Sequence, residues 1–277
     1  MKNTGNKAPL FSIITVAYND AVNLEKTIQN VLSQTCGDFE YVIVDGGSKD
    51  GSVDVIKKYE DRIDLWVSEK DKGICDAMNK GVLLAKGEYI NFMNAGDSFY
   101  DARVLDNVRE ALLAEKVDIL YGKVMKQSSE KSELHYESGG EMSPQSFFMS
   151  IPICHQAAFA KRSLFSTLGL FDEKFPVAFD YAWFARYYHA TQSFKKFRFI
   201  DKIIANYLDG GNSFIKKNQT DRERLAIAKK YFSRYYLMLN YLKFPLESLK
   251  TLVLPWMVKH ELLDRYREIR YKSKVKT

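Results

Sequence analysis

The chain has 277 residues, of which 46% are hydrophobic and 27% charged, and its formal net charge is +6. This composition is that of a globular protein and excludes collagen-like and low-complexity classes. It contains no apolar run of about 18 residues, which excludes a transmembrane helix, and its polar residues 1–7 do not resemble a signal peptide, so we expect a cytoplasmic protein.

The first hundred residues alternate between buried strands and amphipathic helices. We predict these strands, each a short β-rich apolar run: 11–18, 41–44, 64–67 and 88–93. We predict these helices between them: about 24–32, 52–59 and 74–85. Strict alternation of this kind favours a mostly parallel, doubly wound sheet.

After Asp97 the pattern is looser. We predict these helices: 104–113, a short one ending at Gly169, and 180–189. We predict these strands: 117–121, 156–159, 194–199 and 202–207. Residues 127–140 are polar and indicate a loop or hairpin. The chain then ends in two long basic helices, broken near Pro245 and Pro255.

Charged residues are unevenly distributed along the chain. Residues 216–277 carry 16 Lys and Arg against 6 Asp and Glu, whereas the rest of the chain carries 25 against 29. A basic tail on a slightly acidic body favours contact with the inner face of a membrane, and nucleic acid is the alternative. The tail's aromatic and aliphatic residues are equally suited to packing on the body or on a second subunit.

Cys36, Cys75 and Cys154 are far apart and odd in number, which argues against a disulfide framework or a zinc site.

Polar clusters follow the ends of four predicted strands, at 15–19, 45–48, 69–73 and 94–97. In an open parallel sheet, ligands bind just beyond these carboxyl ends. Asp97 is a lone acid there on a loop of small residues, a placement suited to holding a divalent cation against a phosphate. No Gly-x-Gly-x-x-Gly fingerprint and no phosphate-binding P-loop occurs in the sequence. These features suggest a nucleotide diphosphate compound as substrate.

An ordered block of segments carries a family resemblance. It comprises SIITVAYN at 12–19, VLSQT at 31–35, FEYVIVDGGSKDG at 39–51, EKDKGI at 69–74, DAMNKG at 76–81, GEYI at 87–90 and NAGD at 94–97. The block resembles glycosyltransferase family 2, the inverting sugar transferases of GT-A fold. The likeness continues more weakly through His155-Gln156, 169–172 and Asp180.

The resemblance implies a GT-A domain over residues 1–214, with a nucleotide-sugar half at about 9–100 and an acceptor half at about 101–214. A basic helical extension, 215–277, follows. The reaction it implies moves a sugar from a nucleotide diphosphate sugar, first of all a UDP-sugar, to an acceptor hydroxyl. The acceptor is expected to be a glycan or a lipid-linked glycan of the cell surface, and a homodimer is left open.

Site residues follow from the same resemblance. The positions that match the donor pocket are Thr15, Asn19, Asp45, Asp71 and Asp76. Asp97 matches the metal ligand, with Mg²⁺ or Mn²⁺ as cofactor, and Asp180 matches the catalytic base.

Three further residues are candidates for contact with acceptor or phosphate. His155 precedes a strand and is suited to a phosphate, the metal or the acceptor, and Gln156 is its neighbour. Trp183 is suited to stacking on a sugar, although its helical spacing with other aromatic residues is also that of core.

Two departures from the family pattern leave alternatives. Gly46 stands where many members have a second acid that contacts the nucleotide base, and Gly96 stands where many have paired acids. They favour a non-catalytic member that binds a glycan or a partner as the main rival. A sugar nucleotidyltransferase is the other, but its Gly-rich, Arg-containing loop after the first strand is missing.

Overall fold

The computed structural model describes residues 8–127, 135–143, 146–147, 153–208 and 217–232. The chain divides into two units after Tyr231, and the elements given below belong to the first unit. The helix 217–231, which the sequence placed in the basic extension, is therefore part of the first unit. The predicted breaks near Pro245 and Pro255 lie outside the described residues.

The first half of the fold contains four strands and the helices between them. Its elements are β1 (Phe11–Ala17), α1 (Ala21–Leu32), β2 (Phe39–Asp45), α2 (Ser52–Lys58), the 3₁₀ turn η1 (Glu60–Arg62), β3 (Leu65–Ser68), α3 (Ile74–Leu84) and β4 (Tyr89–Phe92). The strands pair in parallel in the order β3-β2-β1-β4, with Ala17 opposite Asp45 and Asp45 opposite Ser68. The predicted parallel sheet is confirmed, and its strand ends lie side by side at one edge.

The second half extends the sheet with both antiparallel and parallel strand pairs. Its elements are β5 (Ser98–Phe99), α4 (Val104–Ala114), β6 (Ile119–Gln127), β7 (His135–Ser138), η2 (His155–Ala157), β8 (Ala158–Lys161), α6 (Arg162–Thr167), α7 (Phe179–Thr191), β9 (Phe197–Leu208) and α9 (Lys217–Tyr231). β8 lies antiparallel between β4 and β6, so η2 directly follows the end of β4 in space. Within the described residues nine strands form one sheet, in the order β3-β2-β1-β4-β8-β6-β9-β5 with β7 on β6.

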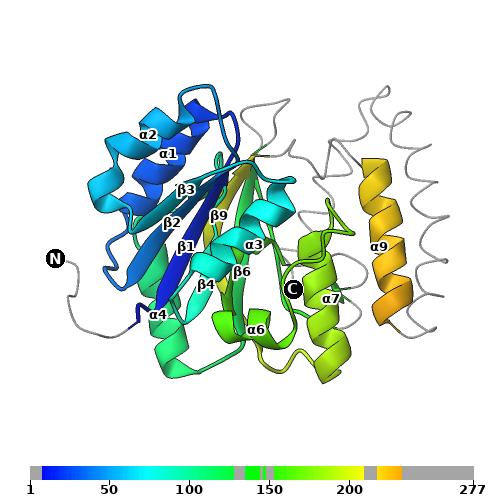
Figure 1. The fold of residues 1–277 in the computed structure, drawn as a ribbon. Coiled ribbons are helices and arrows are strands. Elements are labelled where there is room, and N and C mark those ends of the chain that lie inside the picture. Colours follow the sequence, from blue (N-terminus) through cyan, green and yellow to red (C-terminus); the bar gives the residue numbers. More distant parts are fainter. Residues whose placement is uncertain (1–7, 128–134, 144–145, 148–152, 209–216, 233–277) are drawn as a thin grey trace, which may run out of the picture. The chain divides into compact units, whose positions relative to one another are not determined.

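Helices cover both faces of this sheet. Buried side chains of α1 and α4 share one core cluster with Phe11 and Ile13 of β1. On the other face, α3 approaches β1 so closely that a Cβ at Gly81 would overlap the Ile14 side chain. α3 and α6 cross in front of the sheet in Figure 1. The mixed α/β sheet flanked by helices is as predicted.

One predicted pair of strands is wrong. The segments 194–199 and 202–207 form parts of a single strand, β9, which pairs in parallel with β6 along its length. The pairing shifts register between Tyr121 and Val124, and this irregularity absorbs the polar residues that looked like a turn. Gly122 permits the bulge, because a Cβ there would lie 2.6 Å from the Lys202 carbonyl oxygen.

Smaller differences concern element ends. The predicted strand 156–159 begins two residues later as β8, because His155 to Ala157 form the turn η2. Residues 135–138 of the polar segment form β7 against β6, whereas 128–134 lie outside the described residues. All three cysteines are free thiols.

Candidate active site

The loops after β1, β2 and β3 are tied to one another at the carboxyl edge of the sheet. The Asn19 backbone N–H donates to Ser48 Oγ at 2.8 Å, and Asn19 Oδ1 accepts the Lys49 N–H at 2.9 Å. The Glu69 N–H donates to the Asp45 carbonyl oxygen at 3.0 Å. Asn19 adopts a positive φ of 49°, which an asparagine tolerates well. Three of the predicted polar clusters therefore form one connected surface.

The Thr15 and Asp45 side chains lie buried beneath this surface and form hydrogen bonds inside the protein. The Thr15 hydroxyl donates to the Met93 carbonyl oxygen at 2.7 Å and is fully buried. Asp45 is also 0% exposed, and its carboxylate accepts from the Ser48 N–H at 2.9 Å and from Ser68 Oγ at 2.6 Å. The polar atoms of both side chains are thus engaged inside the protein, beneath the three loops.

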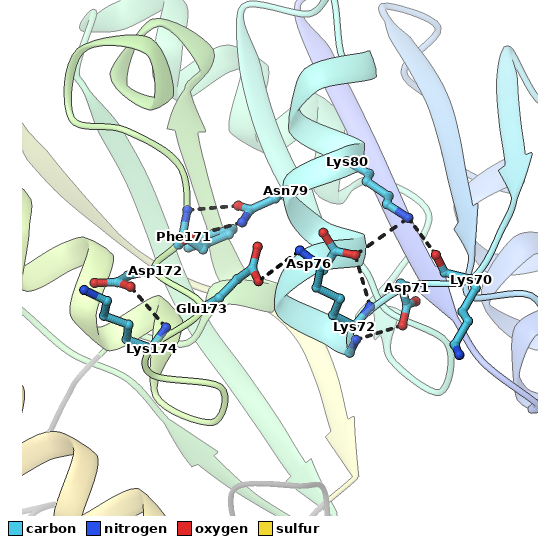
Figure 2. A network of polar contacts seen from close by, with 11 residues as sticks. Lys70, Asp71, Lys72, Asp76, Asn79, Lys80, Phe171, Asp172, Glu173 and Lys174 are labelled. Atoms are coloured by element: carbon cyan, nitrogen blue, oxygen red, sulfur yellow. Dashed lines mark hydrogen bonds and ion pairs between the residues drawn. The ribbon is translucent and has the colours of Figure 1, made fainter.

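Asp71 and Asp76 lie at the start of α3, where Figure 2 shows them among lysines. Asp76 Oδ2 accepts the Lys72 N–H at 3.1 Å and forms an ion pair with Lys80 Nζ at 3.7 Å. Asp71 Oδ1 accepts the Gly73 N–H at 2.8 Å. Asp71 Oδ2 accepts no hydrogen bond from any residue that the structure describes, so it is available to a ligand.

Asn79 of α3 joins this region to the segment that leads into α7. Its amide pairs with both backbone groups of Phe171, at 3.0 Å to the carbonyl oxygen and 2.9 Å from the N–H. Lys72 also forms an ion pair with Glu173 at 3.8 Å, as Figure 2 shows. The sequence alone gave no sign of this link, because its partners are about ninety residues apart.

Asp97 occupies the turn after β4. The turn closes with the Asp97 N–H donating to the Asn94 carbonyl oxygen at 2.9 Å, and Gly96 has a φ of 95°. Asp97 Oδ2 accepts from Gln156 Nε2 at 3.2 Å. Burial raises the pKa of Asp97 to about 6, against the lowering influence of His155 and Gln156. Asp97 is half-buried, and Gln156 is the one side chain among the described residues that donates a hydrogen bond to its carboxylate.

His155 and Asp180 form a hydrogen-bonded pair beside Asp97. His155 Nδ1 lies 3.1 Å from Asp180 Oδ2, and His155 Nε2 lies 3.2 Å from Asn94 Nδ2. Asp180 Oδ1 accepts the Tyr181 N–H at 2.7 Å. Residues from the end of β4, from η2 and from the start of α7 therefore meet in one network, which brings together the predicted His155, Gln156, Asp97 and Asp180.

Each group of this pair shifts the pKa of the other. Burial alone would lower the pKa of His155, but the hydrogen bond and charge of Asp180 raise it above its ordinary value. Burial alone would raise the pKa of Asp180, but the hydrogen bond and charge of His155 hold it below its ordinary value. Asp180 is therefore an ionised acceptor at neutral pH.

Two asparagines of β4 and its turn were missed at the sequence level. Asn91 is fully buried, and its Nδ2 donates to the carbonyl oxygens of Gln156 at 2.9 Å and Ala158 at 3.0 Å. Asn94 contacts His155, as described above. The signal that marks them is a polar residue inside or directly after a buried apolar strand, a place where an amide needs a specific partner.

Trp183 does not lie where an acceptor contact requires it. The side chain is 1% exposed, stacks on Phe165 at a centroid distance of 4.5 Å, and donates its indole N–H to the Gly169 carbonyl oxygen at 3.0 Å. The expected acceptor contact is corrected to a core position, because α7 buries nearly every side chain around Trp183.

The residues around Asp97 fit a divalent cation bound through oxygen. Asn94 Oδ1 is a buried oxygen that has no hydrogen-bond partner among the described residues, and it belongs to the same turn as the Asp97 carboxylate. Hard cations such as Mg²⁺ take oxygen ligands and often use one or two protein groups together with substrate phosphates and water. Among the described residues no group of three His, Cys, Asp or Glu side chains is arranged to hold a metal. A cation here therefore requires phosphate or water ligands as well.

The sequence matches characterised and catalogued proteins over most of its length. A family model described as Glycosyl transferase family 2 matches residues 12–192. A PGL/p-HBAD biosynthesis glycosyltransferase of Mycobacterium bovis is 33% identical over 208 residues, which are 74% of this chain and 78% of that protein. The putative teichuronic acid biosynthesis glycosyltransferase TuaG of Bacillus subtilis is 36% identical over 97 residues, or 34% of this chain and 38% of that protein.

Solved structures share the fold. S. aureus TarS 1-349 in complex with UDP-GlcNAc has a TM-score of 0.63 at 17% identity, and the match covers 79% of this chain and 65% of that one. The mannosyltransferase PcManGT from Pyrobaculum calidifontis, in complex with GDP-Man and Mn²⁺, has a TM-score of 0.58 at 19% identity. That match covers 81% of this chain and 65% of PcManGT, so the chain spans under two thirds of either structure.

Proposed function

The chain belongs to glycosyl transferase family 2 and is a glycosyltransferase, and we propose that it moves a sugar, with inversion, from a nucleotide diphosphate sugar to an acceptor hydroxyl. The observation that carries this proposal is the network of Asp97, Gln156, Asn94, His155 and Asp180. The Asp97 and Asp180 carboxylates lie in one cluster at the carboxyl edge of the sheet, where α/β folds bind ligands, and this supports the proposal.

Asp180 acts as the general base. Its Oδ2 is held by His155 and its Oδ1 by the Tyr181 N–H, so the carboxylate is fixed in orientation and kept ionised. Its side chain remains 29% exposed, which leaves room for an acceptor hydroxyl to donate its proton. A single displacement with one such base inverts the sugar carbon, since the hydroxyl attacks opposite the leaving diphosphate. General bases contribute roughly 10²–10⁴-fold to rate.

Asp97 and the Asn94 amide oxygen are the groups that would hold a cation. When bound, Mg²⁺ or Mn²⁺ supplies charge neutralisation for the departing nucleoside diphosphate. Gln156 orients the Asp97 carboxylate through its 3.2 Å hydrogen bond. The loops after β1, β2 and β3 hold the nucleotide. Asn19 is exposed on these loops, Asp71 is half-buried on the loop after β3, and Asp76 is half-buried in the first turn of α3. Thr15 and Asp45 lie buried beneath the loops.

The acceptor is proposed to be a cell-surface polysaccharide or glycolipid. Support comes from the relatives whose names refer to PGL/p-HBAD and to teichuronic acid biosynthesis. No helix in the described part of the chain has the length and apolar character needed to cross a membrane. The basic residues proposed to contact a membrane surface lie mostly in 233–277, outside the described residues.

The test is a screen of UDP-, dTDP- and GDP-sugars with the purified chain and Mn²⁺, by thermal shift and by release of nucleoside diphosphate. We expect stabilisation by at least one donor, and release of its nucleoside diphosphate as water takes the sugar in place of the acceptor hydroxyl. Asp97→Ala should lose the Mn²⁺-dependent part of nucleotide binding in calorimetry, whereas Asp61→Ala, an exposed acid on η1, should retain it. Unchanged Mn²⁺ dependence in Asp97→Ala would contradict the metal role, and no binding of any donor would contradict the function.

A further inference from the structure

A small corner at the donor surface is formed by Tyr18, Gly46 and Asp71. Gly46 has no positive φ, so its backbone conformation is open to any residue. A Cβ at this position would nevertheless overlap Asp71 Oδ2, and it would lie 3.1 Å from both Asp71 Cγ and Tyr18 Cδ2. A side chain at residue 46 would therefore displace the Asp71 carboxylate, for reasons of space and not of backbone conformation. The Asp71 carboxylate occupies that space.

One oxygen of the Asp71 carboxylate is fixed by a hydrogen bond, and the other accepts none from the described residues. The Gly73 N–H fixes Oδ1 at 2.8 Å, and the loop that carries Asp71 is anchored by the Glu69 N–H on the Asp45 carbonyl oxygen at 3.0 Å. Oδ2 accepts no hydrogen bond from the described residues, and Asp71 is only partly buried. The neighbouring Asp45 carboxylate is already used by Gly47, Ser48 and Ser68. Asp71 is therefore the acid of this corner that a ligand can reach.

Tyr18 supplies an apolar face beside that oxygen. Its side chain is 64% exposed although it directly follows the buried strand β1. Aromatic side chains stack on nucleobases of every kind. An exposed ring beside a free carboxylate oxygen matches a flat heterocycle that carries an N–H on its edge.

We propose that Asp71 is the residue that determines which nucleobase the donor carries, by accepting the imide N3–H of uracil or thymine on Oδ2. The proposal rests on the proposed function, since it assigns the base of the same donor. An ionised carboxylate only accepts hydrogen bonds, so cytosine, whose ring N3 is also an acceptor, is disfavoured. Guanine presents two neighbouring donors, which call for both carboxylate oxygens, and Oδ1 is committed to Gly73.

The first experiment measures the binding of UDP, dTDP, CDP and GDP by calorimetry in the presence of Mn²⁺. We expect the wild-type chain to bind UDP or dTDP more tightly than CDP and GDP. Asp71→Asn should weaken UDP binding by roughly 10- to 100-fold, as expected for loss of a hydrogen bond to a charged group. It should also narrow the preference for UDP over CDP. Asp61→Asn removes the same charge from the exposed turn η1 and should change neither the UDP affinity nor the UDP-over-CDP preference.

The second experiment uses Gly46 to move the carboxylate without altering it. Gly46→Ala places a methyl group where Oδ2 lies, so we expect UDP binding to fall about as far as in Asp71→Ala. The double variant Gly46→Ala/Asp71→Ala should bind UDP as tightly as Asp71→Ala alone, because substitutions of residues in contact have non-additive effects. Thermal unfolding of each variant reports whether it is folded.

These experiments distinguish failure of the Asp71 proposal from failure of the proposed function. Additive losses in the cycle, a retained UDP-over-CDP preference in Asp71→Asn, or a wild-type preference for GDP would overturn the role of Asp71, while turnover of a nucleotide sugar would leave the function standing. If the wild-type chain binds none of the four nucleotides and turns over no nucleotide sugar, both fail.

Discussion

His155 Nδ1 lies 3.1 Å from Asp180 Oδ2, so a residue of the turn η2 holds the first-turn carboxylate of α7. The other ring nitrogen of His155 meets the Asn94 amide at the end of β4. One imidazole thus links the turn that contains Asp97 to the proposed base. This relationship makes the orientation and charge of Asp180 depend on His155.

Replacement of His155 by Gln should lower turnover of the nucleotide sugar while leaving its KM nearly unchanged. Misplacing a catalytic group by about 1 Å can cost on the order of 100-fold in rate. The pH profile provides a second readout. Without His155 the pKa of Asp180 rises, so activity on the acid side should disappear at a higher pH than in the wild type.

His189→Gln serves as the matched control, because His189 lies near the end of α7 and contacts the Tyr231 carbonyl oxygen instead. An acid limb in His155→Gln that coincides with that of the wild type would show that His155 does not act on Asp180.

Asp180→Asn should abolish transfer without loss of donor binding. The amide cannot take the acceptor proton, so we expect a fall in turnover of roughly 10²–10⁴-fold. Steady-state release of nucleoside diphosphate measures the loss, and calorimetry with the donor measures binding. Asp201→Asn, an exposed position on β9, is the comparison variant. Full turnover by Asp180→Asn would remove this residue from the role of base.

Asp97 should make the metal-free protein less stable at neutral pH than at low pH. Its pKa in the folded chain, about 6, lies above the ordinary value of 3.8. The folded state therefore binds the proton more tightly, and its stability falls as pH rises from about 4 to about 6. A rise of this size corresponds to at most about 3 kcal/mol at pH 7.

Asp97→Asn removes this titration. In EDTA, urea unfolding should show the variant to be more stable than the wild type at pH 7.5 and no more stable at pH 4. Equal stability differences at the two pH values would contradict the burial of an uncompensated carboxylate at this position.

Substitution of Trp183 should lower the stability of the fold and leave substrate binding unchanged. Trp183→Ala removes a side chain packed against Phe165 and should lower the free energy of unfolding by about 3–5 kcal/mol. Trp183→Phe keeps an aromatic ring but loses the indole hydrogen bond to Gly169, at about 1 kcal/mol. Denaturant unfolding measures both. Donor binding by Trp183→Phe should match the wild type, and a selective loss of turnover in that variant would return Trp183 to the acceptor site.

The first half of the fold could be predicted from the sequence because each of its strands and helices has a recognisable pattern of neighbouring residues. Buried strands such as β2 and amphipathic helices such as α1 have distinct periodicities, and their strict alternation leaves few topologies. β9 was not readable in the same way. Its polar middle looks like a turn, and only pairing with the bulged β6 across Gly122 makes it continuous.

The sequence by itself determined the family, the parallel sheet and the order of the acids from Asp45 to Asp180, because these depend on residue types at fixed spacing along the chain. Only the tertiary structure decided which of those acids are free. Asp45 is buried under its own loop, Asp71 keeps one free oxygen beside Gly46, and Asp180 is paired with His155. These contacts join segments that are far apart in the chain, and a side chain's availability depends on what packs against it in space.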